Sequence, residues 1–308
     1  MKMNKRSSQP ARNSTASKVI TLATVASSLL LSQSIRAAED ITWLVGIEPA
    51  VRNLEFEQSF ATTELTTDNG TTLTPTKTRT DYDVSLMEIG FTVGAVWSDF
   101  SLILNHSTNL SEEDEDIDIS LNSVKSSTKA SFDREDTTIT LGWSIMDGVS
   151  VFTGYKYGET TTDGDGVNFK ETFEEDGPFV GASYSIPFEA GNLTFSAAYA
   201  SMDGDFKSNQ EIEILTGLVN ITQNSLKYKG DTTGLSFGAS WSGELTDNMI
   251  YTVSLKHQKY DFDSKAQVTR TVEYDPLLGF TTDILTGSAK VKNEETMTSF
   301  GVGISYIF

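Results

Sequence analysis

The last nine residues of the chain limit its fold more than any other feature. Large apolar side chains occupy every second position of this stretch, and Gly301, Gly303 and Ser305 lie between them: Phe300, Val302, Ile304, Tyr306 and Phe308. A period of two residues is that of a β-strand, whose side chains point alternately to opposite faces. One face of this strand is therefore apolar and aromatic, and the other is small. In water such a face would invite aggregation, so it needs another environment.

The same pattern recurs four times upstream, with large apolar residues alternating with Gly, Ser or Thr and an aromatic residue often near the end. The copies cover residues 89–97, 139–145, 180–186 and 235–241. Five partner strands alternate in the same way and lie before or between them: Thr42–Phe56, Phe100–Asn105, Val149–Tyr157, Leu193–Tyr199 and Tyr251–Tyr260. Five copies with one partner each predict five hairpins, and therefore ten strands.

The predicted connections between these strands alternate in length. Short connections are expected at residues 98–99, 146–148, 189–191 and 245–248. Long connections are expected near residues 60–82, 107–136, 158–177, 202–232 and 262–296. All the short connections therefore lie at one end of the predicted hairpins and all the long ones at the other.

This combination resembles the Gram-negative outer-membrane β-barrel proteins, whose closing strand ends on an aromatic residue that the barrel-assembly machinery reads. The resemblance implies an all-β fold: a transmembrane antiparallel up-and-down β-barrel of about ten strands, with short periplasmic turns and long extracellular loops. It also implies that Phe300, Val302, Ile304, Tyr306 and Phe308 form the assembly signal, that outer-membrane lipids and lipopolysaccharide surround the protein, and that the barrel is a monomer.

The alternative architecture is a soluble secreted β-sandwich, which alternation alone does not exclude. The aromatic residues favour the barrel, because they recur near the short connections, as in Trp97, Trp143, Tyr184, Trp241 and Tyr306. In an outer-membrane barrel such residues form a girdle at the membrane interface.

The N-terminus has the pattern of a secretory signal peptide. Basic residues without any acid precede an apolar run from Val19 to Leu31, and a cleavage region follows at residues 36–39. Cleavage after Ala37 is favoured over cleavage after Ala38, which would put Arg36 where a small residue is needed. The alternative, a membrane-anchoring helix, needs an apolar run of about 20 residues, which is longer than this one. The predicted organisation is a signal peptide at residues 1–37 and a barrel domain at residues 38–308.

The composition restricts the partners of the exported chain. Residues 1–37 hold six Lys or Arg and no acid, which leaves 17 basic and 43 acidic residues and a net charge near −26. Such a charge argues against nucleic acid as a partner. The chain has no cysteine, so disulfides and thiolate chemistry are excluded.

The inward face of the predicted strands carries five charged residues. They lie opposite in face to the apolar residues of their strands: Glu48, Arg52, Glu88, Lys156 and Lys256. A charge that faces lipid at the membrane midplane costs about 2–4 kcal/mol, so these side chains are expected in the lumen. They would form either a selectivity lining or a plug of ion pairs. The plug is favoured, because small barrels fill their interior with side chains.

Catalytic patterns are sparse. The two histidines, His106 and His257, have no recognisable serine–acid arrangement beside them. The residues Asp81-Tyr82-Asp83 resemble the acidic pair of omptin-type proteases, which also have ten strands. The Asp–His pair of that family has no counterpart in the later strands. We therefore expect no catalytic residues, no cofactor and no enzymatic activity.

Acidic residues cluster in three segments of the predicted loops, at residues 111–116, 163–166 and 174–176. Residues 163–166 resemble the start of a calcium loop, but the remaining ligands of such a loop are missing. Solvated charge is the favoured interpretation, and no metal site is expected.

The function expected from these patterns is that of a small porin-like or structural barrel. The alternative is a surface binding or adhesion protein that acts through its loops, and an omptin-like or lipid-modifying hydrolase is a third hypothesis. Residues Glu211–Ile214 and Val268–Val272 alternate like strands within the long connections. These two connections are therefore expected to continue as hairpins beyond the membrane.

Overall fold

The computed structural model describes residues 41–62, 65–67, 72–73, 77–111, 113–121, 124–164, 169–210, 219–222, 226–274 and 282–308. The predicted signal peptide at residues 1–37 lies outside this part of the chain. Among the described residues, no helix is long and apolar enough to cross a bilayer.

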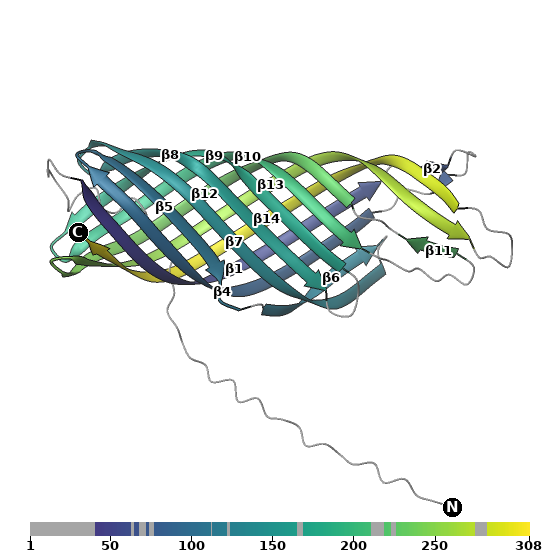
Figure 1. Ribbon diagram of the computed structural model, residues 1–308, viewed down its shortest axis with the longest axis horizontal. Helices are drawn as coiled ribbons and strands as arrows, with labels where there is room; N and C mark the ends of the chain where they lie inside the picture. The colour runs from purple at the N-terminus through teal and green to yellow at the C-terminus, as the bar shows by residue number, and fades with distance from the viewer. Residues whose placement is uncertain are drawn as a thin grey trace, which may run out of the picture.

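Ten long antiparallel strands form one closed barrel, as predicted. They are β1 (Thr42–Thr62), β4 (Lys77–Trp97), β5 (Phe100–Asn109), β7 (Val124–Met146), β8 (Val149–Gly164), β9 (Phe169–Phe188), β10 (Gly191–Gln210), β12 (Leu226–Thr246), β13 (Met249–Tyr274) and β14 (Thr282–Ile307). Each pairs with the next along the chain, and β14 pairs back with β1 from Leu44↔Ile307 to Thr62↔Ala289. The strands are inclined to the long axis of the barrel (Figure 1).

Four short strands supplement the ring: β2 (Leu65–Thr67), β3 (Thr72–Leu73), β6 (Glu113–Leu121) and β11 (Val219–Thr222). Strand β6 continues the line of β5, because both pair with β4 on one side and β7 on the other. Asn109 bridges the break between them. Its side chain donates to the carbonyls of Ser111 and Phe132 and accepts from the Arg134 amide. The wall therefore stays closed where the strand is interrupted.

The four short connections lie where the sequence predicts them. Two-residue turns join β4 to β5, β7 to β8, β9 to β10 and β12 to β13. Ser98 and Gly148 have positive φ angles of 52° and 77°, as tight hairpin turns require. The C-terminus lies at this end of the barrel, opposite the end at which β13 and β14 reach furthest (Figure 1).

The long connections are far shorter than predicted, because the strands continue through most of them. Strands β13 and β14 stay paired up to Glu273↔Thr282, so the prediction of a tall hairpin is confirmed there. The corresponding segment Glu211–Ile214 lies outside the described residues. The strands continue because their inward positions remain apolar, as at Phe132 and Phe262. Each further inward residue buries more apolar surface.

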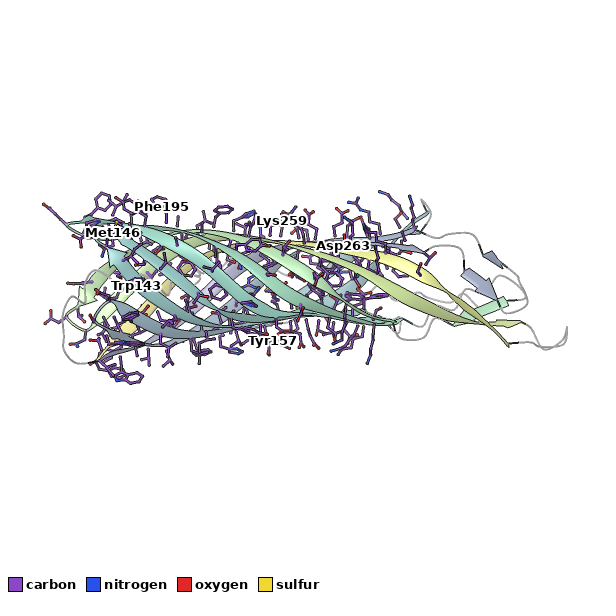
Figure 2. The ribbon with its side chains drawn as sticks, turned by 90° about the horizontal axis from the view of Figure 1, so that it is seen from above. Trp143, Met146, Tyr157, Phe195, Lys259 and Asp263 are labelled. Carbon is purple, nitrogen blue, oxygen red and sulfur yellow. The ribbon has the colours of Figure 1, made fainter. Side chains whose placement is uncertain are left out.

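The outer surface of the barrel changes character along its length. Near the short turns the outward side chains are large and apolar, and Trp143 and Phe195 are about half exposed, at 50% and 47%. Toward the other end outward positions are charged, as at Lys259 and Asp263 (Figure 2). The apolar belt is the surface that a bilayer covers in proteins of this architecture. We refer to the barrel beyond this belt as the wall.

The interior of the wall is an apolar core. Side chains from nearly every strand meet there with almost no exposure: Leu54, Phe56, Phe60, Tyr82, Val84, Leu86, Ile117, Ala130, Phe132, Phe173, Ala200, Met202, Phe206, Tyr228, Tyr260, Phe262, Ala289, Val291 and Met297. At belt level the interior is instead mostly small and hydroxylated, as at Thr140, Thr194 and Ser240. A second small apolar cluster of Leu44, Val96 and Ile250 lies beside the short turns.

Candidate functional site

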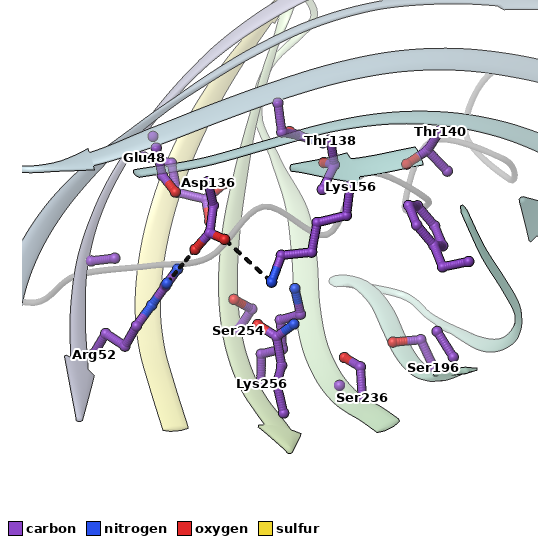
Figure 3. Close-up of a pocket in the computed structure, with 18 of the residues that line it drawn as sticks. Glu48, Arg52, Asp136, Thr138, Thr140, Lys156, Ser196, Ser236, Ser254 and Lys256 are labelled. Carbon is purple, nitrogen blue, oxygen red and sulfur yellow. Dashed lines mark hydrogen bonds and ion pairs between the residues drawn. The ribbon is translucent and has the colours of Figure 1, made fainter. Parts of the chain in front are cut away.

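The five charged residues that the sequence assigns to the lumen all face inward, around one cavity of about 190 Å³ (Figure 3). Glu48, Arg52, Glu88 and Lys156 are no more than 6% exposed, and Lys256 is half-buried. The cavity lies at the boundary between the hydroxylated lumen and the apolar core of the wall. Strand alternation places each of these side chains in the lumen, because each occupies an inward position on its strand.

Asp136 on β7 links the charges on one side of this layer. Arg52 donates to it from β1 and also pairs with Glu88 at 3.0 Å. The Lys156 ammonium on β8 lies 3.3 Å from the same Asp136 carboxylate. Arg52 and Lys156 therefore share one carboxylate, which Arg134 also contacts, and Glu88 supplies a second anion to Arg52.

Arg134 on β7 extends the layer upward to the wall. Its guanidinium contacts Glu295 of β14 at 2.6 Å, Glu175 of β9 at 3.1 Å and Asp136 at 2.9 Å. It also donates to the Thr160 hydroxyl at 2.6 Å. Arg134, Glu175 and Glu295 have side chains no more than 1% exposed. Burying charges is expensive unless each finds a partner, and this network supplies one to each of the three.

Lys156 joins the two halves of the layer. Besides Asp136 it reaches Glu175 at 2.8 Å and the Tyr260 hydroxyl at 3.0 Å. Its ammonium also lies 4.1 Å from the centre of the Tyr260 ring. Tyr260 belongs to the apolar core, so the polar layer and the core meet at this residue.

Sequence reasoning missed four members of this layer, Arg134, Asp136, Glu175 and Glu295. All four fall within or at the edge of segments that were predicted to be long loops, where side-chain parity has no meaning. The available signal was the alternation itself, since Phe132, Arg134 and Asp136 occupy every second position of β7.

The interpretation of residues 174–176 as a solvated acid run is wrong for its central member. Glu175 points into the lumen and is fully buried. Glu174 and Asp176 point outward and bond to Lys207 and Tyr155. Alternation on β9 separates the three acids, so only Glu175 joins the charged layer.

The wall interior holds one further buried acid, Glu171 on β9. Its side chain lies opposite Ser208 of β10 and is 6% exposed. Burial raises the pKa of Glu171 from its ordinary value of 4.5 to about 7, and the Ser208 hydroxyl partly offsets the rise. Glu171 is outside the belt and separate from the charged layer.

The residues considered for omptin-type chemistry do not meet. His106 and His257 lie on outward positions and bond to the hydroxyls of Thr137 and Thr298. Asp81 and Asp83 also alternate outward, and Asp81 pairs with Arg79 at 2.8 Å. Among the described residues, no group of three or more His, Asp or Glu has the arrangement of a metal site.

The residues of the predicted assembly signal lie on the outward face of β14 and just beyond its end. Phe300, Ile304, Tyr306 and Phe308 are 42–61% exposed within the apolar belt. The rings of Tyr306 and Phe308 lie 5.8 Å apart. The backbone of Phe308 bonds to Trp43 in both directions at 3.0 Å, so the chain end is tied to the first strand. Their role in assembly stays a prediction.

No protein-family model matches the sequence, and no relative was found among curated proteins. Solved structures do match. The outer membrane protease OmpT from Escherichia coli superposes with a TM-score of 0.59 at 11% identity, over 90% of this chain and 100% of that one. The translocator domain of the autotransporter NalP from Neisseria meningitidis matches with a TM-score of 0.34 at 12% identity, over 83% of this chain and 88% of that one. OprG from Pseudomonas aeruginosa matches with a TM-score of 0.32 at 13% identity, over 84% and 95%.

The likeness to OmpT corrects one expectation. The sequence led us to expect that the chain is not an enzyme, and the match to a protease over nearly the whole chain contradicts the grounds for that exclusion. A ten-stranded barrel of this shape is an architecture that carries catalysis in another protein. At 11% identity the likeness describes the fold, and no catalytic residue is transferred by it.

Proposed function

We propose that this chain, a β-barrel protein of the Gram-negative outer membrane, is a closed barrel. It acts at the cell surface, where its wall binds polar partners. The observation that carries the proposal is the filling of the lumen by contacts between opposite sides of the ring. Of the functions expected from the sequence, this is the surface-binding alternative, and it differs from the porin-like one in having no conducting path.

Contacts across the lumen support closure. Strands β1 and β9 are five steps apart in the ring of ten, yet the rings of Phe56 and Phe173 lie 6.4 Å apart. Strands β7 and β14 are four steps apart, and Arg134 pairs with Glu295 between them at 2.6 Å. Phe173 and Phe262 also pack at 5.5 Å. Side chains that touch from wall to wall leave no aqueous channel at that height.

The wall supports a role at the surface. A pore needs strands only long enough to cross the hydrocarbon layer, which takes about 9–11 residues. Strands β13 and β14 have 26 residues each, and the excess forms a rigid body with its own apolar core. Its outer face is charged, as at Lys259, Glu294 and Asp263, which suits contact with water and polar partners.

The surroundings that the resemblance implies belong to the same proposal. Outer-membrane lipids cover the apolar belt, lipopolysaccharide surrounds the base of the wall, and the barrel-assembly machinery reads the last strand during insertion. The proposal also includes a monomeric barrel, since the closed ring leaves no free strand edge to which a second copy could pair.

Conductance in planar bilayers tests closure. We expect the purified, refolded wild-type protein to give no discrete openings. The matched variant carries Phe56→Ala, Phe173→Ala and Phe262→Ala, which removes the cross-lumen ring contacts, and it should conduct more than the wild type if it folds. Regular openings from the wild type would contradict the closed barrel.

Adhesion tests the surface role. Cells that produce the protein should bind to a surface coated with lysozyme, a basic protein, more than to one coated with serum albumin, an acidic one. The difference should shrink as salt is added, because exposed charges are screened. Equal adhesion by cells that lack the protein would contradict a binding role.

A further inference from the structure

The cavity in the charged layer is electrically balanced but incompletely paired. Three acids and three bases line it: Glu48, Glu88, Asp136, Arg52, Lys156 and Lys256. Arg52 pairs with Glu88 and Asp136, and Lys156 pairs with Asp136. One acid and one base are then left over, namely Glu48 and Lys256.

Glu48 lacks a partner although it is buried. Its side chain is 6% exposed, and its Oε1 atom is shut off from solvent without any hydrogen-bond partner. Within the part of the chain that the structure describes, the Glu48 carboxyl group makes no ion pair within 4 Å. A buried polar group without a hydrogen-bond partner destabilises the fold, so a native structure normally supplies a partner.

Lys256 is the matching unpaired base. Among the described residues, its ammonium makes neither a hydrogen bond nor an ion pair, although it reaches into the same cavity. In the view of Figure 3, Glu48 and Lys256 lie on opposite sides of the Arg52–Asp136–Lys156 chain of ion pairs. The two groups line the same cavity without forming an ion pair with each other.

We propose that this cavity is a binding site for a small zwitterion of the α-amino acid type, whose ammonium group pairs with Glu48 and whose carboxylate pairs with Lys256. Such a ligand gives each unpaired group the partner that it lacks. Because its own charge is zero, it also leaves the balance of the layer unchanged. The site is independent of the proposed surface function.

The lining and the volume agree with this class of ligand. A cavity of about 190 Å³ has room for a small molecule. Ser196, Ser236 and Ser254 also line the cavity (Figure 3). Hydroxyls both donate and accept hydrogen bonds, so they serve either end of a zwitterion.

Ligands with a single charge fit less well. An anion alone would satisfy Lys256 but would leave Glu48 unpaired and add repulsion from Asp136. A cation alone would satisfy Glu48 but would face Arg52 and Lys256. Either one would add a net charge to the balanced set of charged residues that line the cavity, which is expensive in a buried site.

The test is ligand-observed saturation-transfer NMR on the full-length barrel folded in detergent micelles. The zwitterionic probes are glycine, L-alanine and L-serine, the single-charge probes are acetate and ethylammonium, and L-tryptophan tests the size limit. We expect at least one zwitterionic probe to bind, with acetate and ethylammonium binding at least about tenfold more weakly and L-tryptophan not at all.

Variants assign the binding to the cavity. Glu48→Gln and Lys256→Met should each weaken binding of the zwitterion about tenfold or more, because each removes one charge partner. Lys259→Met is the matched control, since Lys259 lies on the same strand but points outward to Glu294 at 2.6 Å. It should bind as the wild type does. The change in gel mobility on heating shows which variants have folded.

Three results would overturn the proposal. The first is the absence of binding by all three zwitterionic probes up to about 10 mM, a concentration far above the dissociation constant expected of a specific site. The second is acetate binding as tightly as the zwitterions, which would indicate a simple anion site. The third is unchanged binding in both folded cavity variants. If neither variant folds, the comparison of probes on the wild type still decides between these outcomes.

Discussion

The belt and the wall are built from the same strands, but apolar side chains face outward in the belt and inward in the wall. At belt level, Trp43, Val45 and Ile47 of β1 face outward and are apolar. In the wall, the apolar residues of the same strand are Leu54 and Phe56, which face inward. The pairing of β1 with β4 runs through both halves without a shift in register. The apolar residues therefore move from odd to even positions while the backbone stays regular.

This difference shows that alternation fixes which side chains share a face, while the surroundings decide which face must be apolar. Lipid outside the belt allows an interior of small hydroxyl groups. Water outside the wall requires an interior of aromatic and aliphatic groups. The charged layer, which includes Arg52, Arg134 and Lys156, lies at the boundary between the hydroxylated interior of the belt and the apolar core of the wall.

The largest effect is expected at that transition. Replacing Arg134 by Met leaves Glu295 buried without its ion-pair partner and removes one of the two cations that contact Glu175, which should lower the free energy of unfolding by about 3–5 kcal/mol. The measurement is urea unfolding in lipid vesicles, followed by tryptophan fluorescence. Arg79→Met is the control, since Arg79 pairs with acids on the exposed face of the wall and should change stability little. Equal losses of unfolding free energy in the two variants would contradict the claim that ion pairs in the buried layer stabilise the barrel more than those on the surface.

Arginine on the outer face separates belt from wall directly. Phe237→Arg puts a charge into lipid and should cost about 2–4 kcal/mol of unfolding free energy. Ser127→Arg puts the same charge on the outer face of the wall, opposite Asp118, and should change stability by no more than about 0.5 kcal/mol. The same unfolding measurement in lipid applies. If both substitutions cost the same, the boundary of the belt has been drawn in the wrong place.

The interior of the wall should show a pH dependence that traces to Glu171. Its pKa of about 7 in the folded protein exceeds the ordinary value of 4.5, so the folded chain holds a proton that the unfolded chain has released between these values. The stabilising contribution is complete below pH 4.5 and is lost as the pH rises to 7. The loss should be roughly 2–3 kcal/mol relative to Glu171→Gln, measured by unfolding at both ends of that range. Parallel pH profiles for the two proteins would contradict a buried acid.

The smallest effect on stability is expected at the chain end. Phe308→Ala keeps the backbone bonds to Trp43, so the unfolding free energy should fall by no more than about 1 kcal/mol. Assembly in cells should fall much more if the aromatic ring is the signal that the assembly machinery reads. The amount of heat-modifiable protein in the outer membrane measures this. Normal assembly would place the signal elsewhere.

Strand alternation predicted the ring of ten strands, the short turns and the inward position of Glu48, Arg52, Glu88, Lys156 and Lys256. It did so because the lipid-facing pattern repeats in every hairpin. The wall was missed because its pattern is inverted: outward charges, as at Glu55 and Glu57, look like a polar loop when an apolar outer face is expected.

The composition of the site could be predicted only in part for the same reason. Arg134 and Glu295 fall in segments taken as loops, and their contact joins residues 161 positions apart. The tilt of the strands and the closure of the ring decide which charged side chains pair across the lumen. The alternation within one strand predicts only which face a side chain occupies. The two unpaired groups, Glu48 and Lys256, become visible only once the other pairs are known.

The strand that closes the ring, β14, supplies groups that complete the contacts of earlier strands. Glu295 and Met297 of β14 complete the contacts of Arg134 and Arg52, whose strands are made long before. A barrel that lacks only this strand would therefore leave Arg134 without its contact to Glu295 and the apolar core of the wall open at one side. Closure of the seam between β14 and β1 therefore also completes the ion-pair network and the apolar core of the interior.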